Sequence, residues 1–144
     1  MKKNFFLLLL LLIASNYGYS QQKGTVQILD LTTQTFKQKV WNFENNKTFN
    51  RIGKMPIILD FHATWCPPCK KLAPHLQAIQ KKYNGKLIVY KIDVDKEPEL
   101  AKLFKVEAMP TIIFINGKTS FTSELGYKDL SEFEALVKAR FSLK

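Results

Sequence analysis

Two hydrophobic periods alternate along the chain, and each change of period marks a new element. Short runs of β-branched and apolar residues, bounded by turn residues, are typical of strands. They predict strands at residues 25–31, 55–62, 86–95, 111–115 and 118–124. Elsewhere apolar residues recur every three or four positions, which is the spacing of one helix face. This spacing predicts helices at residues 32–46, 66–83, 97–104 and 130–141.

Local signals support several of these elements. Pro98 suits the first turn of its helix, where its missing N–H would have no helical partner. The pair Asn116-Gly117 is a strong signal for a tight hairpin between the last two strands. Asp129 can cap the last helix, with Glu132 at the capping-box position. The alternating order therefore predicts an α/β fold, with a central mixed sheet (parallel core, antiparallel C-terminal hairpin) and helices on both faces.

The N-terminus has the pattern of a secretory signal. Two lysines precede an unbroken apolar run, residues 5–14, and small and polar residues follow. Ten residues span about 15 Å as a helix, half the hydrocarbon thickness of a membrane, so a membrane anchor is the weaker interpretation. We predict a signal peptide at residues 1–20, cleaved near Ser20, and one domain at residues 21–144.

Composition and charge narrow the function only slightly. The chain is 46% hydrophobic, which is enough apolar material for a packed core. Its 22 basic residues outnumber 12 acidic ones, and 20 of them follow residue 20. These basic residues are scattered along the chain, which favours a solvated surface, and no nucleic-acid motif accompanies them. We therefore expect no nucleic-acid partner.

The chain has only two cysteines, Cys66 and Cys69, in the stretch "WCPPC". A disulfide between them would close a four-residue turn and would add little stability, because disulfide stabilisation grows with loop length. A structural zinc site needs four ligands, and the only histidines are His62 and His75. The pair therefore predicts thiol–disulfide chemistry, with no metal and no other cofactor.

The position of the pair gives each cysteine a role. Cys66 lies where a strand gives way to a helix, and free N–H groups at a helix N-terminus stabilise a thiolate. We expect Cys66 to be presented as the nucleophile and Cys69 to be turned inward as the resolving thiol. Pro67 and Pro68 remove two amide donors, which leaves the N–H groups of Cys69 and Lys70 available to the sulfur.

Residues 25–142 resemble the thioredoxin family. The stretch "DFHATWCPPCK" is similar to that family's active-site segment, and Pro74 falls where members have a helix-kinking proline. "MPT" at 109–111 places Pro110 41 residues after Cys69, at the family's cis-proline, and Gly126 also matches. The resemblance implies the thioredoxin fold and a redox disulfide between Cys66 and Cys69.

The resemblance also implies roles for residues around the cysteines. Asp60 lies in an apolar strand, so burial should raise its pKa and let it exchange a proton with Cys69. Lys91 matches the lysine that members place near this aspartate. Met109–Pro110 would be a cis bond facing the cysteines, with the backbone of Met109 pairing with an extended substrate. The predicted substrate-binding residues are Trp65, Pro67, Pro68, Met109, Pro110 and Thr111.

Three features depart from the family pattern. Pro67 replaces the usual glycine, in the pair of residues that strongly influences redox poise. His62 replaces a usual aromatic, and we interpret it as a packing substitute rather than a catalytic base. The segment 42–54 is longer than the corresponding link in compact thioredoxins and has no assigned role.

These observations predict an exported, monomeric protein-disulfide reductase of a bacterial periplasm. It would reduce disulfides in exported protein clients and be re-reduced by a membrane electron donor of the DsbD type, which the resemblance implies. Three alternatives stay open: a dedicated cytochrome c maturation thioredoxin, a disulfide oxidant, and a non-catalytic module that binds peptides in the thioredoxin groove.

Overall fold

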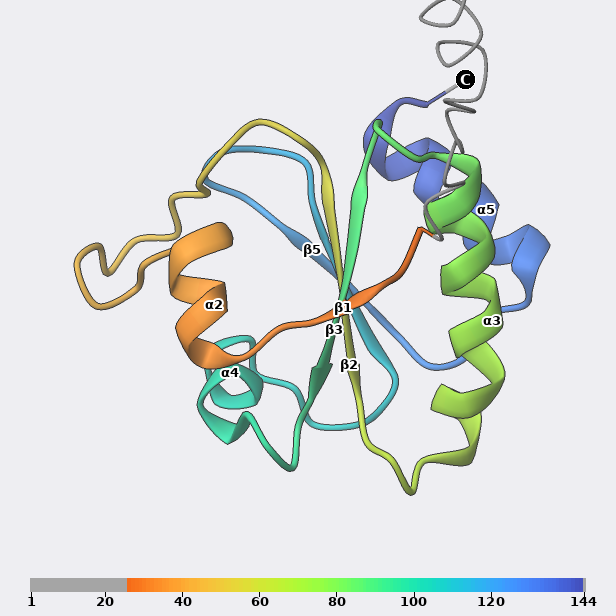
Figure 1. Cartoon of the computed structure of the whole chain (residues 1–144), viewed down its shortest axis with the longest axis horizontal. Coiled ribbons are helices and arrows are strands. Elements are labelled where there is room, and N and C mark those ends of the chain that lie inside the picture. The colour runs from red at the N-terminus through yellow and green to blue at the C-terminus, as the bar shows by residue number, and fades with distance from the viewer. Residues whose placement is uncertain (1–25, 144) are drawn as a thin grey trace, which may run out of the picture.

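The computed structural model describes residues 26–143, so the predicted signal peptide lies outside the described residues. A five-stranded sheet forms the centre of this part (Figure 1). Its strands run in the order β1-β3-β2-β4-β5. Their bounds are β1 Leu29–Asp30, β2 Ile57–His62, β3 Ile88–Asp93, β4 Thr111–Ile115 and β5 Thr122–Leu125. β1 and β2 are parallel to β3, and β4 is antiparallel to both β2 and β5.

Four helices cover the two faces of this sheet. Their bounds are α2 Thr33–Lys39, α3 Pro67–Lys82, α4 Pro98–Leu103 and α5 Leu130–Phe141. Figure 1 shows α2 and α4 on one face and α3 and α5 on the other. The predicted class, a mixed sheet flanked by helices on both faces, is therefore confirmed. No helix between residues 26 and 143 is long and apolar enough to cross a membrane.

Each face of the sheet has its own apolar core, because successive strand residues point to opposite faces. In β2, Leu59 and Phe61 join the core under α2 and α4, whereas Ile58 joins the core under α3 and α5. The first five residues of β2, which lies at the centre of the sheet, are buried. Asp60 is the one carboxylate in this strand, so the fold places a charge-bearing group inside its centre.

The predicted helix at 32–46 is wrong in its second half. The helix ends at Lys39, and Val40 caps it by donating its N–H to the carbonyl of Phe36. The following segment carries Trp41 and Phe43, which pack edge-to-face at 5.8 Å between ring centroids. Phe43 is buried although it lies in a loop. Its position therefore continues the apolar spacing of a helix where no helix forms.

Two sheet boundaries also differ from their predictions. β5 begins at Thr122, which pairs with Phe114, so the hairpin connection covers residues 116–121 and Asn116-Gly117 is not a two-residue turn. β1 is reduced to Leu29–Asp30, because only these two residues align with Tyr90 and Lys91 of β3. The last helix begins and ends as predicted, with Asp129 and Glu132 forming its capping box.

Candidate functional site

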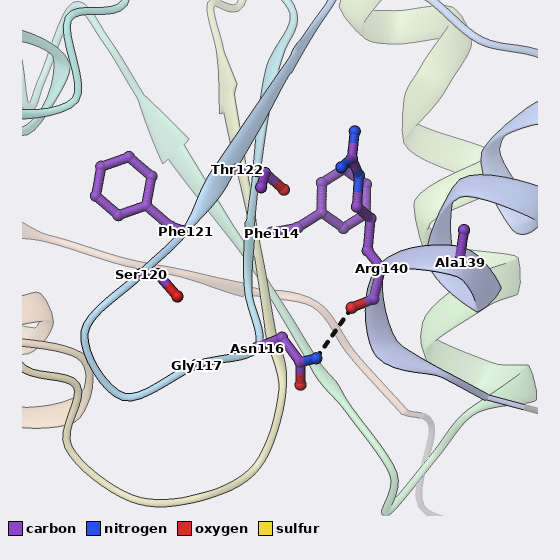
Figure 2. Close-up of a pocket in the computed structure, with 8 residues that line it drawn as sticks. All are labelled: Phe114, Asn116, Gly117, Ser120, Phe121, Thr122, Ala139 and Arg140. Carbon is purple, nitrogen blue, oxygen red and sulfur yellow. Dashed lines mark hydrogen bonds between the residues drawn. The ribbon is translucent and has the colours of Figure 1, made fainter.

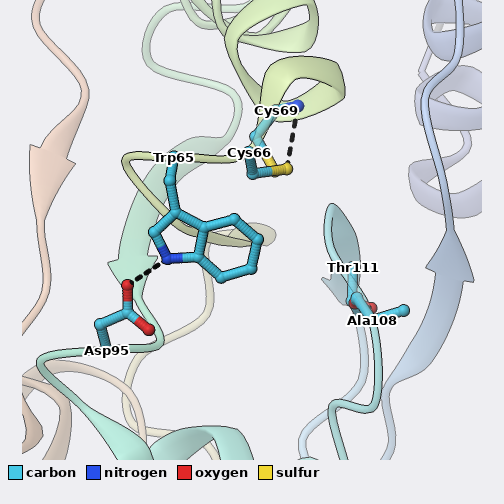
Figure 3. Close-up of a disulfide and its surroundings, with 6 residues drawn as sticks. All are labelled: Trp65, Cys66, Cys69, Asp95, Ala108 and Thr111. Atoms are coloured by element: carbon cyan, nitrogen blue, oxygen red, sulfur yellow. Dashed lines mark hydrogen bonds between the residues drawn. A yellow bond between two sulfur atoms is a disulfide. The ribbon is translucent and has the colours of Figure 1, made fainter.

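The two cysteines lie where the loop after β2 leads into α3, with Cys66 at the end of this loop and Cys69 in the first turn of the helix (Figure 3). Cys66 is the N-cap of α3 and Pro67 and Pro68 occupy its first turn, as the sequence predicts. Cys66 and Cys69 form a disulfide with an S–S distance of 2.02 Å. The Cys69 N–H donates to Cys66 Sγ at 3.3 Å, so the helix N-terminus supplies a donor to this sulfur.

The second expected donor is not available to the sulfur. The Lys70 N–H donates instead to the carbonyl of Cys66 at 3.2 Å. This is the regular helical bond from residue i to residue i−4, and it takes precedence because α3 starts immediately after Cys66. Because both prolines lack an N–H, Cys69 is the one amide of the first turn that contacts Sγ.

The predicted difference in exposure between the cysteines is wrong for this disulfide form. Cys66 is 3% exposed and Cys69 is 4% exposed. Both pack in a small apolar cluster with Ala63, Val94 and Met109, and two of these come from distant segments. The asymmetry lies elsewhere: Cys69, and not Cys66, lines a cleft of about 270 Å³ that also contains Asp60.

Asp60 has the burial expected of a proton-exchanging carboxyl. It is 4% exposed, and its Oδ1 has no hydrogen-bond partner within residues 26–143. Burial raises the pKa of Asp60 from 3.8 to about 7, and the positive charge of Lys91 opposes this rise. A carboxyl with this pKa can take up and release a proton near neutral pH, beside Cys69 in the same cleft.

Lys91 lies beside Asp60, as the resemblance implies, but its ion pair is with Asp30. The parallel register aligns Asp60 with Lys91 and Lys91 with Asp30, so three charged residues form one row across β2, β3 and β1. The Lys91 ammonium is 3.4 Å from Asp30 Oδ1. The sequence does not reveal the role of Asp30, because only the register between β1 and β3 places it next to Lys91.

The surface beside the disulfide is formed by Trp65, which is 63% exposed. Its indole N–H donates to Asp95 Oδ2 at 2.7 Å, which fixes the ring over the loop (Figure 3). Asp95 is a second missed residue, because it lies 30 positions away in the sequence. Pro67 is exposed and Pro68 is partly exposed, so both lie at the same surface.

The second side of the site is the loop that enters β4. The Met109–Pro110 peptide bond is cis, as predicted, and Met109 packs against the cysteine cluster. Thr111 does not fit its predicted place among the substrate-binding side chains. It is 6% exposed and its hydroxyl donates to the carbonyl of Ala108 at 2.6 Å, so its side chain is used within the loop.

A separate pocket of about 240 Å³ lies at the far end of β4, between the β4–β5 connection and α5 (Figure 2). The Asn116 side-chain amide donates to the carbonyl of Arg140 at 3.0 Å, and the Arg140 guanidinium pairs with Glu124. This pocket lacks the cysteines and Asp60. Within the described residues, no group of three or more His, Cys, Asp or Glu side chains could hold a metal ion.

Comparisons with known proteins match the sequence and the fold of this chain. The family model "Thioredoxin" matches residues 27–139. Thioredoxin from Borreliella burgdorferi is 36% identical over 115 residues, which cover 78% of this chain and 97% of that protein. Mitochondrial thioredoxin from mouse is 39% identical over 86 residues, which cover 60% of this chain and 52% of that one. The solved structure of Malassezia sympodialis thioredoxin has a TM-score of 0.65 at 26% identity, covering 80% of this chain and 91% of that chain.

Proposed function

The chain belongs to the thioredoxin family, and from that premise we propose that it is an exported thiol–disulfide oxidoreductase that reduces disulfides in exported protein clients. One observation carries the chemistry. The Cys66–Cys69 disulfide lies at the N-terminus of α3, with the buried carboxyl of Asp60 in the cleft that Cys69 lines.

In the proposed reaction, each step uses one residue of this site. In the reduced protein the Cys66 thiolate attacks one sulfur of a client disulfide, and the other client sulfur leaves as a thiolate. Asp60 then takes the proton of the Cys69 thiol, and the Cys69 thiolate attacks Cys66 Sγ in the mixed disulfide. The second client sulfur leaves, so two electrons have passed to the client and the Cys66–Cys69 disulfide has formed.

The reducing direction is tested by the equilibrium reduction potential of the Cys66–Cys69 pair in the mature protein. We expect a value near −270 mV, which is typical of thioredoxin, measured against a dithiothreitol buffer. Such a couple must be supplied with electrons, and a membrane donor of the DsbD type would fill that role outside the cytosol. A value near −120 mV, typical of DsbA, would identify an oxidant and overturn the proposed direction.

Export is supported by the signal-like pattern of residues 1–20 and is tested separately. We expect the full chain, expressed in a bacterium, to appear in the periplasmic fraction with a mass that corresponds to cleavage near Ser20. A control that starts at residue 21 should stay in the cytosolic fraction. Recovery of the uncleaved full chain in the cytosolic fraction would contradict export and leave the redox chemistry intact.

A further inference from the structure

His62, which the sequence predicts as a packing residue, lines the cleft that also contains Asp60 and Cys69. It ends β2 two residues after Asp60, so both side chains point to the face of the sheet that α3 covers. Both also line the cleft of about 270 Å³ that contains Cys69. The strand therefore delivers two titratable groups, rather than one, to the cleft of the resolving cysteine.

Both groups have an unused buried atom. Asp60 Oδ1 and His62 Nε2 are buried, and neither has a hydrogen-bond partner among residues 26–143. Residues two apart on a strand are separated by about 6.6 Å between Cα atoms. Water occupies about 30 Å³ per molecule in the liquid, so a cleft of about 270 Å³ has room for water beside the two side chains.

Burial favours the neutral form of His62, and the charges around it partly offset one another. Burial lowers the pKa of His62, while the negative charge of Asp93, its register partner on β3, opposes this effect. Lys91 on β3 lowers the His62 pKa further, and Asp30 on β1 raises it. Lys70 of α3 lines the same cleft and adds another positive charge on that side. Burial therefore shifts both groups toward their neutral forms, raising the pKa of Asp60 to about 7 and lowering that of His62, and a neutral imidazole has a free nitrogen that can accept a proton.

We propose that His62 is a second proton-transfer residue, which receives from Asp60 the proton of Cys69 and passes it to solvent. The proposal rests on the thiol–disulfide exchange described above. Asp60 takes the Cys69 proton while the Cys69 thiolate displaces the client thiolate from Cys66 Sγ. The Asp60 proton then moves through water in the cleft to the neutral imidazole of His62. The imidazolium releases this proton to solvent. The released client thiolate takes up a proton from solvent.

The test isolates the resolving step. Reduced protein is mixed in a stopped-flow instrument with excess dithiobis(nitrobenzoate), whose released thiolate absorbs visible light. Attack by Cys66 gives a first phase that depends on reagent concentration, and attack by Cys69 on the mixed disulfide gives a second phase that does not. No client and no electron donor take part, so the result is independent of whether the proposed client reduction is correct.

Two variants and one control are compared across pH 5 to 9. His62→Phe keeps an aromatic ring and His62→Gln keeps a hydrogen-bonding group, but neither can carry the proton. We expect both to slow the second phase by about ten-fold, which is less than the loss of a direct general acid or base, because Asp60 still takes the proton of Cys69. Their second-phase pH profile should also lose one ionisation, while the first phase above pH 7 is unchanged. His75→Gln, which removes the histidine that contacts Tyr127 and the carbonyl of Lys128, should match the parent protein.

Two results would overturn the proposal. One is a second phase with the parent rate and parent pH profile in either His62 variant. The other is a second phase slowed equally at every pH with the profile shape retained, which would assign His62 a packing role. Urea unfolding of each variant accompanies the kinetics, so that a loss of folded protein is not counted as a slower step.

Discussion

Replacing Cys69 with serine is expected to stop turnover at the mixed disulfide. Cys66 keeps its place as the N-cap of α3 and can still attack a client disulfide, but no second thiol remains to release the client. We expect insulin reduction with dithiothreitol as electron source to lose its protein-dependent rate by about a thousand-fold or more, as for other removed nucleophiles. When the variant is first reduced and then freed of dithiothreitol, a covalent adduct with the client should accumulate and be visible by non-reducing electrophoresis and intact mass.

The matched control is Cys66→Ser, which also replaces a sulfur atom with oxygen, but at the other cysteine. This variant should lose turnover equally but form no adduct, because Cys69 lies inside the helix turn and faces the Asp60 cleft. An adduct on Cys66→Ser and none on Cys69→Ser would reverse the roles of the two sulfurs. Turnover retained by both variants would contradict catalysis by this pair and favour a module that only binds peptides.

The chemistry of the site was predictable because its signals are local. The two cysteines are separated by two prolines and follow shortly after a buried strand. This local pattern is enough to place one sulfur at a helix N-terminus. The raised pKa of Asp60 follows from a lone carboxylate in the apolar run "IILDF". Periodicity and caps likewise predicted α3 and α5, whose burial patterns are those of helices packed on one face.

The errors concern features that depend on distant segments. Cys66 is buried because Val94 and Met109 are brought against it by β3 and by the loop before β4, and no local pattern contains that contact. The Trp65–Asp95 hydrogen bond and the Lys91–Asp30 ion pair require strand register in the same way. The helix predicted at 32–46 failed because burial of Trp41 and Phe43 in a loop repeats the apolar spacing of a helix.

Asp60→Asn is expected to stabilise the oxidised protein, by an amount that grows as the pH rises from about 4 to about 7. Folding raises the pKa of Asp60 from 3.8 to about 7, so the folded protein binds this proton more tightly than the unfolded chain does. The resulting stability is fully present below about pH 4 and is lost as the pH rises through about 7. Above that pH the buried carboxylate costs on the order of 4 kcal/mol, which the neutral amide avoids.

Urea unfolding of the disulfide form at pH 4.5 and at pH 8 measures this difference. The free energy of unfolding of Asp60→Asn should exceed that of the parent by several kcal/mol at pH 8 and by far less at pH 4.5. Asp30→Asn is the control, since it neutralises an exposed carboxylate in the same charged row and should change stability by less than about 1 kcal/mol at either pH. An equal effect of Asp60→Asn at both pH values would show that the Asp60 pKa is not raised. The carboxyl would then be ionised throughout and unable to take the proton of Cys69, so the resolving step would need a different base in this cleft.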